Sequence, residues 1–405
     1  MTKADKFLSA ILFALCLCTI VLSVRYINNQ NKWSPIDEYA HFDYVEKLLI
    51  GRLPHLSDPV SEEIYQHIKN NPTQSVSGVS QTREELGLGN FSYQAKHPPL
   101  YFMVLSVPEY VLQKMDIDVF RRLQILRIFS YFLFVAGMFM CIPVFNALRR
   151  LGFQIPMFYS LGCVLFGLLI FVHERYGLGN NAFSPLLINC SVLYLLKYRL
   201  EPENKFLYLF LIFCGLSLLA ALTNIFIVPF LCVFIFDTYR KNFTWRNFST
   251  AMIVPLLTVG AALAWKTLSE PDPDFEDFIQ TVLAMTIPAG VLNYTQFMNL
   301  LTQDTFTLNI IGEHFDITRL MIYLFLFSSI LCGFYYRQVW YKHRWLIYST
   351  VLLIAFACIT YMANKYIPRV TWVAFRHYLG FIPMVYVACT GFIPVLYTRY
   401  FTKQE

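Results

Sequence analysis

The sequence predicts an all-α polytopic membrane protein with about ten transmembrane helices. Hydrophobic residues make up 57% of the 405 residues, and charged residues only 14%, whereas soluble domains carry about 25% charged residues. Apolar runs close to the ~20 residues that cross a bilayer recur along the whole chain. We therefore expect one transmembrane domain over 1–405, with a mean hydropathy of +0.49.

Hydropathy places the predicted spans in chain order near 7–24, 125–148, 155–172, 182–198, 205–222, 225–238, 248–267, 319–337, 345–363 and 377–398. The first span is expected to be a retained anchor, because Arg25 follows it where a signal peptide would have a small-residue cleavage site. Segment 100–115 is also apolar, but Pro108 and Glu109 interrupt it. We expect an interfacial or partly inserted helix there.

The distribution of Lys and Arg predicts the orientation of the spans. On one side of this count lie Lys3, Lys6, Arg149, Arg150, Lys197, Arg199, Lys205, Arg240, Lys241, Arg246, Arg337, Lys342, Arg344, Arg399 and Lys403. That side is predicted to be cytoplasmic and to hold both termini. The opposite side holds the large first loop 25–99, the short loop 173–181, the loop 268–318 and the loop 364–375. Loop 268–318 contains no Lys or Arg and is long enough to hold short helices.

Other compositional features exclude several classes of protein. The ten cysteines all lie in apolar runs, so they are expected to be small buried hydrophobic residues and not disulfides or metal ligands. The net charge of +6 is spread over short loops between spans. It forms no basic stripe, so we expect no nucleic-acid partner.

The first motif, Pro-Ile-Asp-Glu-Tyr-Ala-His-Phe at 35–42, opens the first loop. Apolar spacing predicts a helix over 37–50 that lies on the membrane with an apolar underside, and Gly51 is well placed to end it. Asp37 and His41 share a face of this helix, with Glu38 about 100° away. The two acids either take part in chemistry at this site or are there only because negative charges are stabilised at the positive N-terminal end of a helix.

The second motif, Gln-Ala-Lys-His-Pro-Pro-Leu-Tyr at 94–101, ends the same loop. Its paired prolines force the preceding residue into an extended conformation and account by themselves for an entry into the membrane. Lys96 and His97, however, are predicted on the same side and at the same depth as Asp37. This placement favours a functional role for both.

The third motif is the short loop 173–181, which carries Arg175, Asn180 and Asn181. Its glycines and asparagines are explained by turn geometry. Its charged residues at the membrane edge are either a surface ion pair or substrate contacts.

The fourth motif places Arg369, Arg376 and Tyr378 on the outer side, before the last span. Outer arginines run against the positive-inside trend, and they either bind phosphate through the planar guanidinium or snorkel to the interface. Asp37 and His41 are also spaced to bind a divalent metal, but two ligands are too few to define a site.

With these motifs, the sequence resembles the C-type (GT-C) membrane glycosyltransferases, above all bacterial relatives of dolichyl-phosphate-mannose protein mannosyltransferases and the aminoarabinose transferases of lipid A. The matching residues are Asp37, Glu38, His97, Pro98, Pro99, Leu100, Tyr101, Asn180, Asn181, Arg376 and Tyr378. The resemblance implies transfer of a hexosyl or pentosyl group, with inversion, from a polyprenyl-phosphate or diphosphate donor. The acceptor is a glycan, lipid or protein on the periplasmic face of the bacterial inner membrane.

The resemblance also implies roles for individual residues. Asp37 would be the general base that takes the proton of the acceptor, and its neighbour Glu38 would complete the catalytic pair by positioning the sugar or orienting Asp37. Cations would stabilise the leaving phosphate. The predicted substrate-binding residues are His41, Lys96, His97, Arg175, Asn180, Asn181, Arg376 and Tyr378.

Two other functions stay open at the level of sequence. An O-antigen ligase or polymerase is also membrane-embedded with a large outer loop, and it would depend on outer-loop arginines and a histidine. A transporter or flippase would place ionisable residues near the middle of its spans, whereas nearly all charges here lie at span ends.

Overall fold

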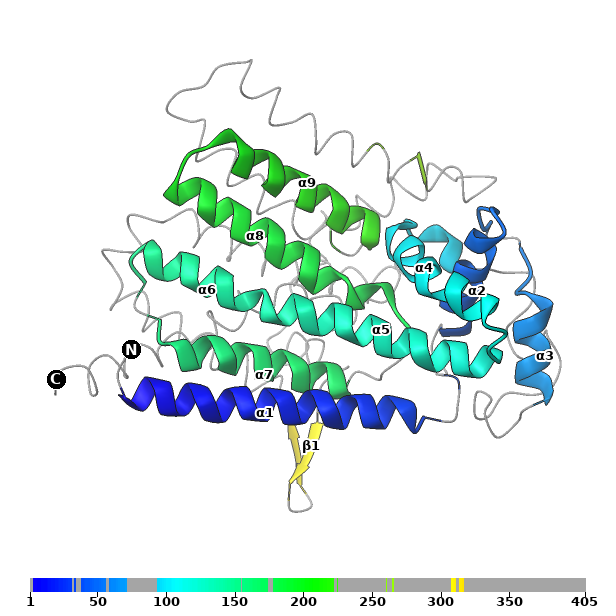
Figure 1. The fold of residues 1–405 in the computed structure, drawn as a ribbon, viewed down its shortest axis with the longest axis horizontal. Coiled ribbons are helices and arrows are strands. Elements are labelled where there is room, and N and C mark those ends of the chain that lie inside the picture. The colour runs from blue at the N-terminus through cyan, green and yellow to red at the C-terminus, as the bar shows by residue number, and fades with distance from the viewer. Residues whose placement is uncertain are drawn as a thin grey trace, which may run out of the picture.

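A computed structural model of the chain describes residues 3–30, 33, 38–55, 58–70, 93–153, 155–173, 178–221, 224, 260, 264–265, 307–310 and 313–316. These residues form a bundle of long helices with a lobe of shorter helices at one end (Figure 1).

The bundle consists, within the described ranges, of α1 (Lys3–Asn28), α5 (Val119–Phe139), α6 (Cys141–Arg150), α7 (Met157–His173), α8 (Ser184–Leu200) and α9 (Asn204–Ala220). Figure 1 shows these helices lying side by side, with α5 and α6 forming one nearly continuous rod. Helix α8 packs against α9 on one side and the α5–α6 rod on the other, whereas α1 packs against α7 and α5.

Two of these segments, α1 and the rod Val119–Arg150, are long and apolar enough to cross a membrane. Helices α7, α8 and α9 have 17 residues each and coincide with the predicted spans 155–172, 182–198 and 205–222. The helical prediction is therefore confirmed for the described part of the bundle. The later spans lie outside the described residues, apart from three positions of 248–267, and the total of ten stays a prediction.

The ends of the α5–α6 rod follow from its sequence. Asp118 is the N-cap of α5, because its carboxylate accepts hydrogen bonds from the backbone N–H groups of Phe120 and Arg121 at 3.1 and 3.4 Å. The rod is interrupted at Met140. Pro143 has no N–H to donate to the carbonyl of Phe139, which accounts for this break.

Gly137 sets the distance between α5 and α8. A Cβ atom at this position would lie 2.4 Å from the backbone nitrogen of Leu186 and 2.8 Å from the carbonyl carbon of Pro185. The absent side chain therefore lets the two backbones touch. The Asn189 side chain also donates to the Gly137 carbonyl at 2.9 Å, which ties the two helices together inside the core.

The lobe at the end of the bundle, called the end lobe below, contains α2 (Glu38–Leu49), α3 (Glu62–Asn70), η1 (Tyr93–Lys96) and α4 (Leu100–Lys114). It covers the end at which α5 begins (Figure 1). The end lobe has its own core, in which Trp33, Phe42, Tyr44 and Phe102 are buried. The rings of Tyr44 on α2 and Phe102 on α4 stack with their centroids 3.8 Å apart.

Helix α2 confirms the predicted helix over 37–50 to within one residue at each end. Gly51, with φ +70°, ends it as expected. The prediction of a surface helix with one apolar side is wrong, however, because residues 38–45 are all buried. Helix α4 and the start of α5 enclose α2, so its polar residues face other protein groups.

Helix α4 matches the segment 100–115 that the sequence sets apart from the spans. Tyr101, Phe102 and Leu105 are buried on its inner side, whereas Val107 and Val111 are more than half exposed on the other. Helix α4 is thus two-sided, as an interfacial helix must be. Insertion into a membrane stays a prediction.

The predicted loop 268–318 contains a short antiparallel hairpin, β1 (Thr307–Ile310) and β2 (Glu313–Asp316), in which Thr307 pairs with Asp316. Every other element among the described residues is helical, so the all-α class is confirmed for them apart from this hairpin. The part of the loop that could hold short helices lies outside the described residues. Alternating Thr-Leu-Asn-Ile spacing in β1 is typical of a strand.

The opposite end of the bundle gathers residues that the sequence assigns to the cytoplasmic side. Arg150, the last residue of α6, pairs with Glu201 directly after α8 at 2.7 Å. The Asp5 carboxylate of α1 accepts the Phe158 N–H at 3.1 Å and so caps the start of α7. The α6–α7 and α8–α9 connections, which are predicted to be cytoplasmic, therefore lie at one end of the bundle. The first loop and the α7–α8 connection lie at the other end.

The described cysteines carry no disulfide, as expected. Five of them are buried: Cys16, Cys141, Cys163, Cys190 and Cys214. Cys18 is exposed on α1, so the expectation of burial is wrong for this one.

Candidate functional site

Parts of three sequence motifs meet where α2, α4 and the α7–α8 connection join the first turns of α5. Glu38 from the first motif accepts the Leu178 N–H of the third at 3.0 Å. The Tyr101 hydroxyl from the second motif accepts the Gly179 N–H at 3.2 Å. These residues are far apart in sequence, and their convergence defines the candidate functional site.

Glu38 is held by Arg127 of α5 in a two-pronged ion pair. The guanidinium Nε donates to Oε1 at 2.7 Å, and Nη2 donates to Oε2 at 2.5 Å. Both side chains are almost completely buried, at 0% and 1% exposure. Charge-assisted bonds in this planar geometry are among the strongest in proteins. Together with the Leu178 N–H, they fix the Glu38 carboxylate, and this fixation suits the positioning role more than proton transfer.

Arg127 also anchors the chain that leads from α1 to α2. Its Nη1 donates to the Gln30 carbonyl at 3.5 Å. One turn earlier on α5, the Gln124 amide donates to the carbonyls of Asn28 and Gln30 at 3.2 and 3.3 Å. The end of α1 is thereby fastened to α5, close to the segment that carries the first motif.

Tyr101 joins α4 to α5 and to the α7–α8 connection. Its hydroxyl shares a hydrogen bond of 2.8 Å with the Ser130 hydroxyl, in addition to the bond from Gly179. Burial raises the pKa of Tyr101 above its ordinary value. The phenol therefore stays protonated at neutral pH and acts as a fixed hydroxyl.

His41 and Tyr44 of α2 lie over the Phe102 ring of α4. The His41 ring stacks on it with centroids 5.5 Å apart, and His41 is only 6% exposed. The Tyr44 hydroxyl donates to the His97 carbonyl at 3.0 Å. The first and second motifs are therefore held together by aromatic stacking and by a side chain-to-backbone bond.

Asn180 contributes a polar group that the described residues leave unsatisfied. Its side chain is buried, at 5% exposure, and no described residue accepts a hydrogen bond from its Nδ2. Buried amides usually have a partner in the protein, in water or in a ligand. Asn180 therefore offers a donor at the site, and the neighbouring Asn181 is half-buried.

Other predicted site residues lie outside the described residues. These are Asp37, Arg175, Arg376 and Tyr378. For Lys96, the backbone is placed at the end of η1, directly before His97. Among the predicted site residues that the structure describes, Glu38, His41, His97 and Asn180 belong to segments that contact one another or contact α4.

Sequence reasoning missed Arg127, Ser130 and Trp265. The indole of Trp265 donates to the Ala95 carbonyl of the second motif at 3.1 Å. A signal for Arg127 did exist, because it lies in the outer half of predicted span 125–148, against the positive-inside trend. The same departure from the positive-inside trend identifies Arg376 as a candidate in the sequence. No local pattern points to Ser130 or Trp265.

The described residues contain no group of three or more His, Cys, Asp or Glu side chains arranged to hold a metal ion. Comparisons with protein families, with characterised proteins and with solved structures found no match to this chain.

Proposed function

We propose that this chain is a glycosyltransferase of the bacterial inner membrane that uses a polyprenyl-phosphate-linked sugar as its donor. The acceptor is a glycan, a lipid or a protein at the outer face. One observation carries the proposal: Glu38, Tyr101 and the Leu178–Gly179 backbone, from three separate motifs, form one hydrogen-bonded site. The three motifs are therefore close enough to contact one substrate.

The location of the site suits a donor that is half lipid and half sugar. The site lies at the end of the bundle, beside two segments that are long and apolar enough to cross a membrane. A polyprenyl chain would stay in the membrane alongside the helices, while the phosphate and sugar reach the end lobe. A water-soluble sugar donor would not require a site beside the membrane-spanning helices.

In the proposed reaction, an acceptor hydroxyl or amine attacks the anomeric carbon from the face opposite the phosphate. The bond between that carbon and the phosphate oxygen breaks, and its electron pair leaves on the oxygen. The acceptor proton passes to Asp37, the general base. Attack from the opposite face inverts the configuration at the anomeric carbon.

Glu38 supports this step without taking the proton. Its carboxylate is fixed by Arg127 and the Leu178 N–H, so the backbone next to Asp37 is held in one position. Asn180 supplies an amide donor for a sugar hydroxyl. Arg376, with Lys96 and Arg175, neutralises the charge that grows on the leaving phosphate.

The test is glycosyl transfer by membranes that contain either the unchanged protein or Asp37→Asn. Radiolabelled polyprenyl-phosphate sugars are supplied with lipid and glycan acceptors. Glu201→Gln is the matched control, because Glu201 pairs with Arg150 at the opposite end of the bundle and is half exposed. We expect labelled product from the unchanged protein and from the control, and none from Asp37→Asn at equal expression.

Full activity of Asp37→Asn would overturn the general base. If transfer then depended on Arg175 or Arg369, a ligase or polymerase mechanism would replace the proposed one. Absence of product from every donor, with stably inserted protein, would contradict the transferase proposal and favour the ligase or transporter alternatives.

A further inference from the structure

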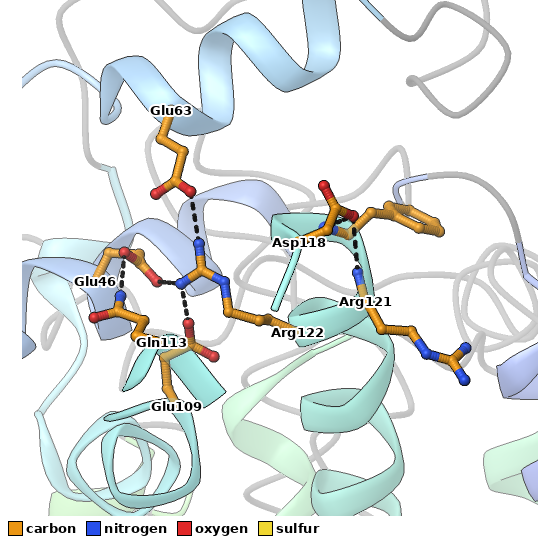
Figure 2. Close-up of polar contacts among 8 residues, drawn as sticks. Glu46, Glu63, Glu109, Gln113, Asp118, Arg121 and Arg122 are labelled. Atoms are coloured by element: carbon orange, nitrogen blue, oxygen red, sulfur yellow. Dashed lines mark hydrogen bonds and ion pairs between the residues drawn. The ribbon is translucent and has the colours of Figure 1, made fainter. Parts of the chain in front are cut away.

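A second buried polar cluster lies at the other end of α2 and α4, away from the candidate site. Arg122 of α5 faces three carboxylates (Figure 2). Its Nη1 donates to Glu46 of α2 at 3.0 Å and also pairs with Glu109 of α4. Its Nη2 donates to Glu63 of α3 at 2.8 Å. This cluster joins all three helices to the start of α5.

The carboxylates differ sharply in their access to water. The Glu109 side chain is 0% exposed, Glu46 is 13% exposed and Glu63 is 55% exposed, while Arg122 is 3% exposed. One guanidinium facing three ionised carboxylates leaves an excess of two negative charges. Glu63 can be screened by water, but Glu46 and Glu109 cannot, and they share the same Arg122 nitrogen.

The hydrogen bonds of the two buried acids, Glu46 and Glu109, are also incomplete. The Gln113 amide donates to Glu46 Oε2 at 2.8 Å, so both oxygens of Glu46 have partners. Glu109 Oε2 is buried and has no hydrogen-bond partner among the described residues. An unpaired ionised oxygen in this position is costly, and a proton on Glu46, donated to Glu109, would remove one negative charge from the cluster.

We propose that Glu46 holds a proton at neutral pH in a hydrogen bond to Glu109, and that release of this proton loosens the packing of α2 against α4. Two carboxylates this close cannot both ionise without a large electrostatic cost. Protonation lets one acid donate a hydrogen bond to the other and leaves Arg122 to balance the remaining charge. The inference does not depend on the proposed function.

The neighbouring helices offer no second cation among the described groups, since the Lys114 ammonium of α4 lies over the exposed Tyr110 ring, 5.6 Å from its centroid. On α2, the Lys47 ammonium is bound to Asp43 at 2.6 Å. On α5, Asp118 caps its own helix, and Arg121 points away from the cluster (Figure 2) toward Asn28 and Gln124. On α3, the other titratable groups are Glu62, Tyr65, His67 and Lys69, and His67 accepts the Trp33 indole N–H.

The electrostatics agree with this geometry. Burial, followed by the hydrogen bond with Glu109, raises the pKa of Glu46 to about 8. Folding raises the pKa of this carboxyl, so its protonated form favours the packed state. This stabilisation is fully present below the unfolded pKa of ~4.3 and is lost as the pH rises through the folded pKa. The packing of α2 on α4 should therefore weaken between about pH 4 and pH 8 and change little above that.

The helices involved also carry the candidate site. Helices α2 and α4 run in parallel, since His41 lies by Phe102 near their starts, and Glu46 lies by Gln113 near their ends. Glu38 opens α2, and Tyr101 lies in the first turn of α4. A change in packing at the carboxylate end would therefore be transmitted along both helices to the residues of the site.

The test is amide hydrogen exchange of the full chain in a membrane mimetic, as a function of pH and corrected for intrinsic exchange. For α2 and α4, we expect protection factors to fall by up to about tenfold per pH unit, the slope for one proton, and to level off near pH 8. Glu46→Gln should abolish this slope, because the amide donates to Glu109 at every pH. Glu63→Gln is the matched control and should keep it.

Protection that does not vary with pH in the unchanged protein would overturn the proposal, even if no variant folds. An unaltered slope and midpoint in Glu46→Gln would do the same. If Glu46→Gln fails to insert, Glu109→Gln carries the same expectation, because it supplies an amide donor from the other side of the pair.

Discussion

Glu38 and Arg127 lie on different helices, α2 and α5, and meet in a buried pair with N–O distances of 2.7 and 2.5 Å. The pair joins the first residue of the end lobe's first helix to the third turn of a candidate membrane span. It therefore fixes the end lobe on the bundle at the position where the first motif begins.

Arg127→Ala should destabilise the protein strongly. It leaves the Glu38 carboxylate buried without its cation, which costs about 3–5 kcal/mol. Arg150→Ala is the control, because its pair with Glu201 is exposed and should contribute about 0–1 kcal/mol. Thermal unfolding in detergent measures both. Equal melting temperatures for the two variants would show that the Glu38–Arg127 pair does not hold the end lobe in place.

Tyr101→Phe should cost about 1–3 kcal/mol, because it leaves the Gly179 N–H without its acceptor. Combination with Ser130→Ala should give a loss smaller than the sum of the two single losses, since both remove the same hydrogen bond. Tyr110→Phe, on the exposed side of the same helix, should change stability by less than about 0.5 kcal/mol. Strictly additive losses would contradict the Tyr101–Ser130 contact.

Gly137→Ala should separate α5 from α8. The new methyl would lie 2.4 Å from a backbone atom that has little freedom to move, and overpacking of this kind costs about 1–3 kcal/mol or more. Gly179→Ala is a matched control, because a Cβ atom there meets nothing within 4 Å and its φ of −162° is extended. A Gly137→Ala protein as stable as the control would mean that the two backbones do not touch.

Arg376→Ala should raise the KM for the lipid-linked donor by at least about tenfold, the equivalent of one lost charge-assisted hydrogen bond. The KM for the acceptor should change little. Arg399→Ala, on the predicted cytoplasmic side, serves as the control. Steady-state kinetics with separate variation of the two substrates gives both constants. Unchanged donor kinetics would remove Arg376 from the phosphate site.

Local patterns predicted the elements of the fold well. The helix 37–50 and the interruption of 100–115 by Pro108 and Glu109 correspond to α2 and α4, because periodicity and breakers act within one or two turns. Glu109 was recognised only as an interruption. Its partner Arg122 explains the charge, but pairing across helices leaves no trace in local sequence.

The site was predicted only in part, for the same reason. Three motifs were expected to share one side of the membrane, and their residues Glu38, Tyr101 and Asn180 do lie at one end of the bundle. Arg127 was not expected, because its partner is 89 residues away. Burial of α2 on all sides was also missed, since an apolar stripe reveals one packed face and cannot show that polar faces are covered too.

The most direct test of the central claim is to map where the donor binds. The full chain in membranes is irradiated with a polyprenyl-phosphate sugar that carries a photoreactive group on the sugar, and the labelled peptides are identified by mass spectrometry. We predict labelling in the segments of α2, η1–α4 and the α7–α8 connection, with loss of all three labels when unlabelled donor competes. Specific labelling confined to other segments, or no competable labelling at all, would contradict the proposed donor site.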